Sequence, residues 1–88
     1  MGRAPLHVTL VTAPECHLCD HARQVLARLA ESWPIVVEEF SWHSPEGVAL
    51  VRGDGVPFPP ALYVAGELYG YGRLSEARLR RELARRIP

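Results

Sequence analysis

The sequence lacks the features typical of disulfide-rich secreted domains, membrane proteins and nucleic-acid-binding proteins. It has only two cysteines, too few for the disulfide framework of a small secreted domain. No apolar run approaches the roughly 20 residues that cross a bilayer. The ten basic residues, all of them Arg, balance ten acidic residues. No net charge therefore draws the chain to nucleic acid or to an anionic membrane.

The amino-terminal segment also lacks the pattern of an export signal. Its apolar stretch is short, alternates with Thr and runs directly into the first expected strand. With 88 residues, 48% of them hydrophobic, the chain is long enough for one folded domain, residues 1–88, and too apolar to be disordered. We therefore expect a single cytoplasmic domain that is a monomer and has no membrane span.

Hydrophobic periodicity predicts seven elements in the order β-α-β-α-β-β-α. Runs typical of strands cover residues 7–12, 35–40, 61–64 and 67–71. Helical spacing of apolar residues covers residues 17–31, 46–52 and 76–86. Ser44 and Ser75 are the expected N-caps of the second and third helices. Because a helix separates the first two strands, we expect a right-handed βαβ unit in which these strands are parallel.

The most informative feature is the segment Cys16-His17-Leu18-Cys19. A bridge across so short a loop removes little entropy from the unfolded chain, so redox chemistry or metal binding explains the pair better than a structural role. Cys16 follows a strand and opens a helix, where free N–H groups and the helix dipole lower the pKa of a thiol. Cys16 is therefore the candidate nucleophile and Cys19 the resolving thiol. A protonated His17 would lower the pKa of Cys16 further.

Two other classes of function remain open. The first is a module that binds a metal ion or an iron–sulfur cluster through Cys16. A zinc site needs four ligands and the chain has only one pair of cysteines, so His17, His21 or His43 would have to complete it. The second is a non-catalytic adaptor that keeps the fold. Of these readings we favour the redox-active pair and expect no bound metal.

These residues resemble the glutaredoxin branch of the thioredoxin-like superfamily, and small bacterial glutaredoxin-like proteins within it. The resemblance covers nearly the whole chain, and its clearest segments are Pro14-Glu15-Cys16-His17-Leu18-Cys19-Asp20, Pro60-Ala61-Leu62-Tyr63-Val64-Ala65-Gly66 and Gly70-Tyr71-Gly72. It implies a glutaredoxin-type three-layer α/β sandwich, with a four-stranded mixed sheet and helices on both faces. It also implies a thiol–disulfide oxidoreductase in which a cis-proline forms the substrate platform. Pro60 is the candidate for that proline, and Pro57 is the alternative.

The chain departs from the family pattern at the expected substrate platform. Pro59 stands where the family usually has a Val whose N–H and C=O both bond the substrate, and proline has no N–H. The usual glutathione-binding set is incomplete, with Arg73 as the remaining candidate for a glutathione carboxylate. We therefore expect no bound cofactor and do not favour glutathione as a co-substrate. The resemblance implies a disulfide-containing protein or a low-molecular-weight thiol as substrate, and a thiol or flavoprotein as reductant.

Several side chains near the pair have no assigned chemistry. Asp20 and His21 are expected on the solvated surface of the first helix. Four aromatic side chains are expected to line a groove near the cysteines: Trp42, Phe58, Tyr69 and Tyr71. Trp33 and Phe40 are expected in the core.

Overall fold

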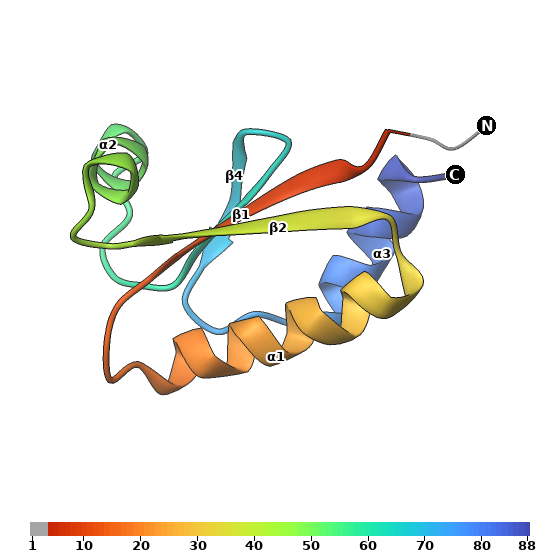
Figure 1. Ribbon diagram of the computed structural model, residues 1–88, viewed down its shortest axis with the longest axis horizontal. Helices are drawn as coiled ribbons and strands as arrows, with labels where there is room; N and C mark the ends of the chain where they lie inside the picture. The colour runs from red at the N-terminus through yellow and green to blue at the C-terminus, as the bar shows by residue number, and fades with distance from the viewer. Residues whose placement is uncertain (1–3) are drawn as a thin grey trace.

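The structure, a computed structural model, describes residues 4–88 as a sheet with helices on both faces (Figure 1). The strands are β1 (Leu6–Thr12), β2 (Ile35–Ser41), β3 (Ala61–Val64) and β4 (Glu67–Tyr71). The helices are α1 (His17–Ser32), α2 (Pro45–Gly53) and α3 (Glu76–Arg86). The predicted order is confirmed, and every boundary lies within one residue of the expected one.

The four strands lie in the order β2-β1-β3-β4. β1 and β2 are parallel, as predicted, and pair from Leu6 opposite Ile35 to Thr12 opposite Ser41. β3 runs antiparallel to β1, with Ala61 opposite Val11. The chain therefore enters β3 at the same end of the sheet at which it leaves β1. This shared end brings the residues before β3 beside the β1–α1 connection.

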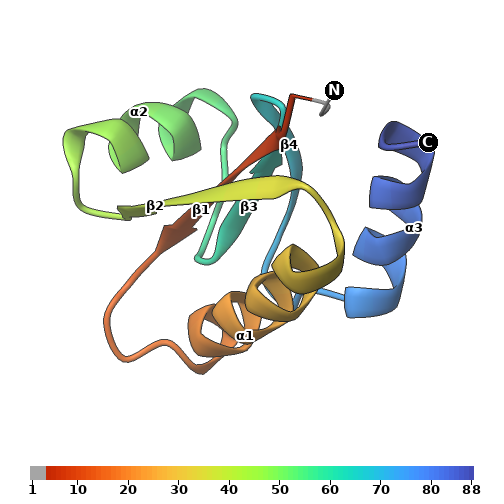
Figure 2. The same cartoon turned by 45° about the vertical axis from the view of Figure 1, so that its right-hand side comes forward.

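Two apolar clusters hold the three layers together. Figure 2 shows α1 and α3 on one face of the sheet and α2 on the other. The larger cluster joins α1 and α3 to the sheet through buried side chains that include Val8, Leu10, Val25, Leu26, Leu29, Leu62, Leu79 and Leu83. The smaller cluster joins α2 to the opposite face through Val11, Val51, Val56, Ala61 and Tyr63. β1 and β3 contribute to both clusters, so burial on both faces fixes the register of these central strands.

Local signals set the ends of the helices. The Ser44 hydroxyl accepts a hydrogen bond of 3.0 Å from the Gly47 N–H, and the Ser75 hydroxyl accepts one of 3.3 Å from the Arg78 N–H. Both predicted N-caps are thus confirmed. α1 ends at Ser32, and its C-cap Trp33 is extended because a proline follows it. Within residues 4–88, no helix has both the length and the apolar character to cross a membrane.

Candidate active site

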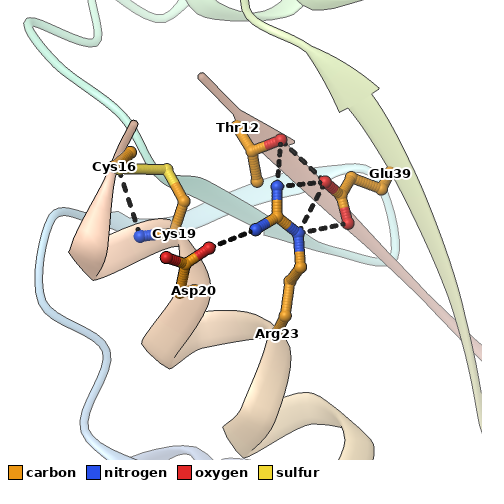
Figure 3. Close-up of a disulfide and its surroundings, with 6 residues drawn as sticks. All are labelled: Thr12, Cys16, Cys19, Asp20, Arg23 and Glu39. Carbon is orange, nitrogen blue, oxygen red and sulfur yellow. Dashed lines mark hydrogen bonds and ion pairs between the residues drawn. A yellow bond between two sulfur atoms is a disulfide. The ribbon is translucent and has the colours of Figure 1, made fainter. Parts of the chain in front are cut away.

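The two cysteines lie at the connection between β1 and α1. After Thr12 the chain turns through Pro14 and Glu15, and Glu15 takes a left-handed backbone conformation with φ of 53°. The turn lets Cys16 act as the N-cap of α1, with extended backbone angles. A disulfide joins Cys16 to Cys19, and their Cα atoms are 5.2 Å apart (Figure 3). The structure therefore brings the two predicted residues into direct covalent contact.

The two sulfur atoms have different surroundings. The Cys19 side chain is completely buried, whereas Cys16 is partly exposed. The Cys19 N–H donates a hydrogen bond of 3.1 Å to the Cys16 sulfur. A backbone donor at a helix N-terminus favours negative charge on the atom it contacts. In the reduced pair, this geometry favours a thiolate at Cys16. Because Cys16 is partly exposed, a disulfide in solution can also reach it.

The predicted platform lies at the start of β3. The Pro59–Pro60 peptide bond is cis, and Pro57 is not preceded by a cis bond. Pro60 is buried and Pro59 half-buried. The Pro60 carbonyl accepts a hydrogen bond of 2.8 Å from the Gly72 N–H, which ties the start of β3 to the end of β4. Since Ala61 lies opposite Val11, the register places Pro60 next to Thr12, at the end of the sheet where the cysteines lie.

A pocket of about 190 Å³ opens beside this platform. Its lining includes Ala22 of α1, Pro60, Tyr71 and Arg73. The Arg73 side chain is exposed, and within residues 4–88 no carboxylate forms an ion pair with it. His17, the first residue of α1, is also exposed. The structure thus brings Pro60 and Arg73 together, while His17 lies on the helix surface beside Cys16.

A charged cluster that the sequence analysis missed lies next to the disulfide (Figure 3). The Arg23 guanidinium donates to both carboxylate oxygens of Glu39 at 3.1 and 2.9 Å, and to Asp20 at 2.7 Å. The buried Thr12 hydroxyl donates to Glu39 at 2.7 Å. The hydrogen bond from Arg23 is the main cause that lowers the pKa of the Glu39 carboxyl, with Thr12 contributing. The cluster links α1, which carries the cysteines, to β1 and β2.

This cluster predicts a pH-dependent stability. A lowered pKa in the folded state means that charged Glu39 stabilises the protein above its unfolded pKa, near the reference value of 4.5, and that this contribution disappears as pH falls through the folded pKa. We therefore expect Glu39→Gln to be less stable than the wild type at pH 7, by under about 1 kcal/mol because the pair is partly exposed. In urea unfolding followed by circular dichroism, the difference should shrink as pH falls below 4.5 and vanish once pH is below the folded-state pKa of Glu39.

The neighbouring residue provides the control for that measurement. Glu38 forms no ion pair with any other residue in the described part of the chain. Glu38→Gln should therefore not reproduce the loss of stability expected for Glu39→Gln. An equal pH-dependent loss in both variants would mean that the contact with Arg23 is not its cause.

Other expectations about the surroundings of the pair hold only in part. Asp20 is exposed but paired with Arg23, and His21 is half-buried rather than solvated. The Trp42 side chain packs against the smaller cluster on the α2 face. Trp33 packs against the larger cluster as expected, but Phe40 belongs to neither cluster. Within residues 4–88, no group of three or more Cys, His, Asp or Glu residues is arranged to hold a metal ion.

The sheet order, the helices on both faces and the linked cysteines at the start of α1 are those of the thioredoxin fold. Solved structures agree, and those that resemble the chain include thioredoxins and a glutaredoxin. A mutant thioredoxin of Halobacterium salinarum NRC-1 has a TM-score of 0.68 at 24% identity, over 91% of this chain and 73% of that one. A Thermus thermophilus thioredoxin has a TM-score of 0.62 at 26% identity, over 92% and 72% of the two chains.

Glutaredoxin 1 of Francisella tularensis has a TM-score of 0.62 at 13% identity, over 92% of this chain and 98% of that one. No protein-family model and no curated protein matches the sequence. The chain therefore belongs to the thioredoxin-like superfamily by fold, and it matches the length of glutaredoxin more nearly than that of thioredoxin. Together with the linked cysteines, this likeness supports a thiol–disulfide oxidoreductase.

Proposed function

We propose that the chain reduces disulfides by dithiol exchange, with Cys16 as the nucleophile and Cys19 as the resolving thiol. The Cys16 thiolate attacks one sulfur of a substrate disulfide, and the other substrate sulfur leaves as a thiolate that takes a proton from solvent. The Cys19 thiolate then attacks the Cys16 sulfur and releases the second substrate thiol. The substrate gains two electrons, and the pair becomes the Cys16–Cys19 disulfide.

The difference in exposure between the two sulfur atoms carries this proposal. A partly exposed Cys16 that accepts the Cys19 N–H suits first attack, because the thiolate is both stabilised and accessible. A buried Cys19 reacts poorly with an external disulfide but lies next to the mixed disulfide that Cys16 forms. The buried position therefore suits the second, intramolecular step.

The substrate platform is Pro60 with the neighbouring Pro59; Arg73 lines the same pocket as Pro60, and His17 lies next to Cys16 at the start of α1. A disulfide-containing protein or a low-molecular-weight disulfide reacts there, and an external thiol or a flavoprotein returns the pair to the reduced state. Pro59 can accept one hydrogen bond from a substrate main chain but donates none. The protein works as a cytoplasmic monomer without a bound cofactor.

The reduction potential and activity of the pair test this function. We expect the Cys16–Cys19 pair to equilibrate with a dithiothreitol buffer at a potential between about −270 and −120 mV, the range of dithiol oxidoreductases. We also expect each molecule of reduced protein, which carries two thiols, to cleave one molecule of a chromogenic aromatic disulfide. A pair that does not equilibrate, or reduced protein that leaves the disulfide intact, would refute the proposal.

A further inference from the structure

Two exposed aromatic side chains form a patch on the protein surface. Phe58 and Tyr71 are each 49% exposed, and they are the two most exposed large apolar side chains among residues 4–88. Their ring centroids are 5.3 Å apart, and the rings meet edge to face at 85°. Apolar surface gathered in this way is typical of a site that binds another molecule.

The neighbouring backbone restricts where the Phe58 ring can lie. Phe58 lies between Pro57 and Pro59, whose backbone angles φ are fixed. The ring lies against Gly72, where an added Cβ atom would be only 3.0 Å from the Phe58 Cε1 atom. Gly72 also has φ of 78°, which other residues rarely adopt. The Phe58 ring is therefore positioned before any partner binds, so binding costs little side-chain entropy.

The patch is continuous with the proposed platform. Tyr71 lies opposite Ala61, the residue after Pro60, and the Gly72 N–H donates to the Pro60 carbonyl. Tyr71 and Pro60 also line the same pocket. The patch therefore borders the platform at which the reacting cysteine of a substrate is proposed to bind.

Main-chain pairing at the platform is limited, so side chains must supply more of the binding energy. Pro59 has no N–H to donate, and the Pro60 carbonyl already accepts from Gly72. Arg73 and Arg78 also line the pocket, and neither has an ion-pair partner in the described part of the chain. An acidic side chain would complement them.

We propose that the Phe58–Tyr71 patch selects the substrate, by binding a large apolar side chain next to the reacting cysteine of an acidic protein segment. This inference rests on the proposed disulfide-reductase function and narrows its substrate to a protein disulfide. A glutathione mixed disulfide would leave the patch unused, because glutathione has carboxylates but no large apolar side chain.

The proposal can be tested with two acidic peptides, each closed by a disulfide. The peptides are identical except at the position next to one cysteine, where one has Leu and the other has Ser. With the wild type, we expect kcat/KM for the Leu peptide to exceed that for the Ser peptide about 10-fold, mostly through KM. In Phe58→Ser this ratio should fall to about 1, whereas Phe58→Leu should retain most of it. Tyr71→Ser should lower the ratio as well, and it serves as the second variant if Phe58→Ser does not fold.

Val36→Ser is the matched control, because Val36 is 43% exposed but lies on β2, at the other edge of the sheet. It should leave the peptide ratio at the wild-type value. A wild type that reduces both peptides equally, or an equal loss in Val36→Ser, would overturn the inference while the reductase function stands. If the wild type reduces neither peptide and no small aromatic disulfide, both proposals fail.

Discussion

Replacing Cys16 by Ser is expected to lower disulfide reduction by about three orders of magnitude or more, because a hydroxyl at neutral pH does not replace a thiolate as the attacking group. Replacing Cys19 by Ser is expected to have a different result. Cys16 would still attack, but nothing would displace it from the substrate, so a mixed disulfide would accumulate. Intact-protein mass spectrometry after reaction with a disulfide peptide separates the two variants, since only Cys19→Ser should gain the mass of one peptide thiol.

Ala27→Ser is the control for a hydroxyl placed on the same helix. Ala27 is exposed on α1, away from its first turn, and this variant should react like the wild type. If Cys16→Ser forms the adduct and Cys19→Ser does not, the assigned roles are reversed. If neither variant forms an adduct while the wild type remains active, the reaction does not pass through a mixed disulfide.

The second large effect concerns stability. Leu29 is completely buried on α1, in the cluster that joins α1 and α3 to the sheet. Leu29→Ala is expected to lower the free energy of unfolding by about 2–5 kcal/mol, since it removes apolar contacts and leaves a cavity. A protein of this size has only about 5–15 kcal/mol in total, so the variant should unfold at much lower denaturant concentration. Urea unfolding followed by far-UV circular dichroism measures the loss.

Two variants serve as controls for the loss expected in Leu29→Ala. Leu29→Met nearly conserves volume and should cost less than about 1.5 kcal/mol. Val37→Ala removes apolar atoms from a side chain that is 40% exposed on β2, and it should cost much less than Leu29→Ala. If Val37→Ala lowered the free energy of unfolding as much as Leu29→Ala does, burial would not determine the cost of these substitutions.

The fold was predictable because its signals are local. The strand–helix junction around Cys16 depends on a β-branched run, Pro14 and a helical stripe, all of which can be seen in the sequence. The seryl N-caps at Ser44 and Ser75 were predicted for the same reason. Parallel pairing of β1 and β2 then followed from the helix between them.

Contacts that depend on register were not predictable. The pairing of Arg23 with Glu39 arises because Thr12 and Glu39 lie near the same end of two parallel strands under α1. Only the spacing of Asp20 and Arg23, three residues apart on one helix, could have suggested part of the cluster. Periodicity also does not say which face of the sheet Trp42 takes, because this residue lies in the turn after β2. Its N–H donates to the Thr12 carbonyl, and its side chain packs toward α2.

The Cys16 sulfur is both the N-cap acceptor of α1 and the atom proposed to react. A thiolate is a stronger acceptor than a disulfide sulfur, so we expect the hydrogen bond from the Cys19 N–H to stabilise the first turn of α1 more in the reduced protein. The stability of the first turn of α1 and the reduction potential of the Cys16–Cys19 pair are thereby thermodynamically linked. A substitution that weakens the start of α1 will make the reduced form harder to maintain, even when it touches neither sulfur.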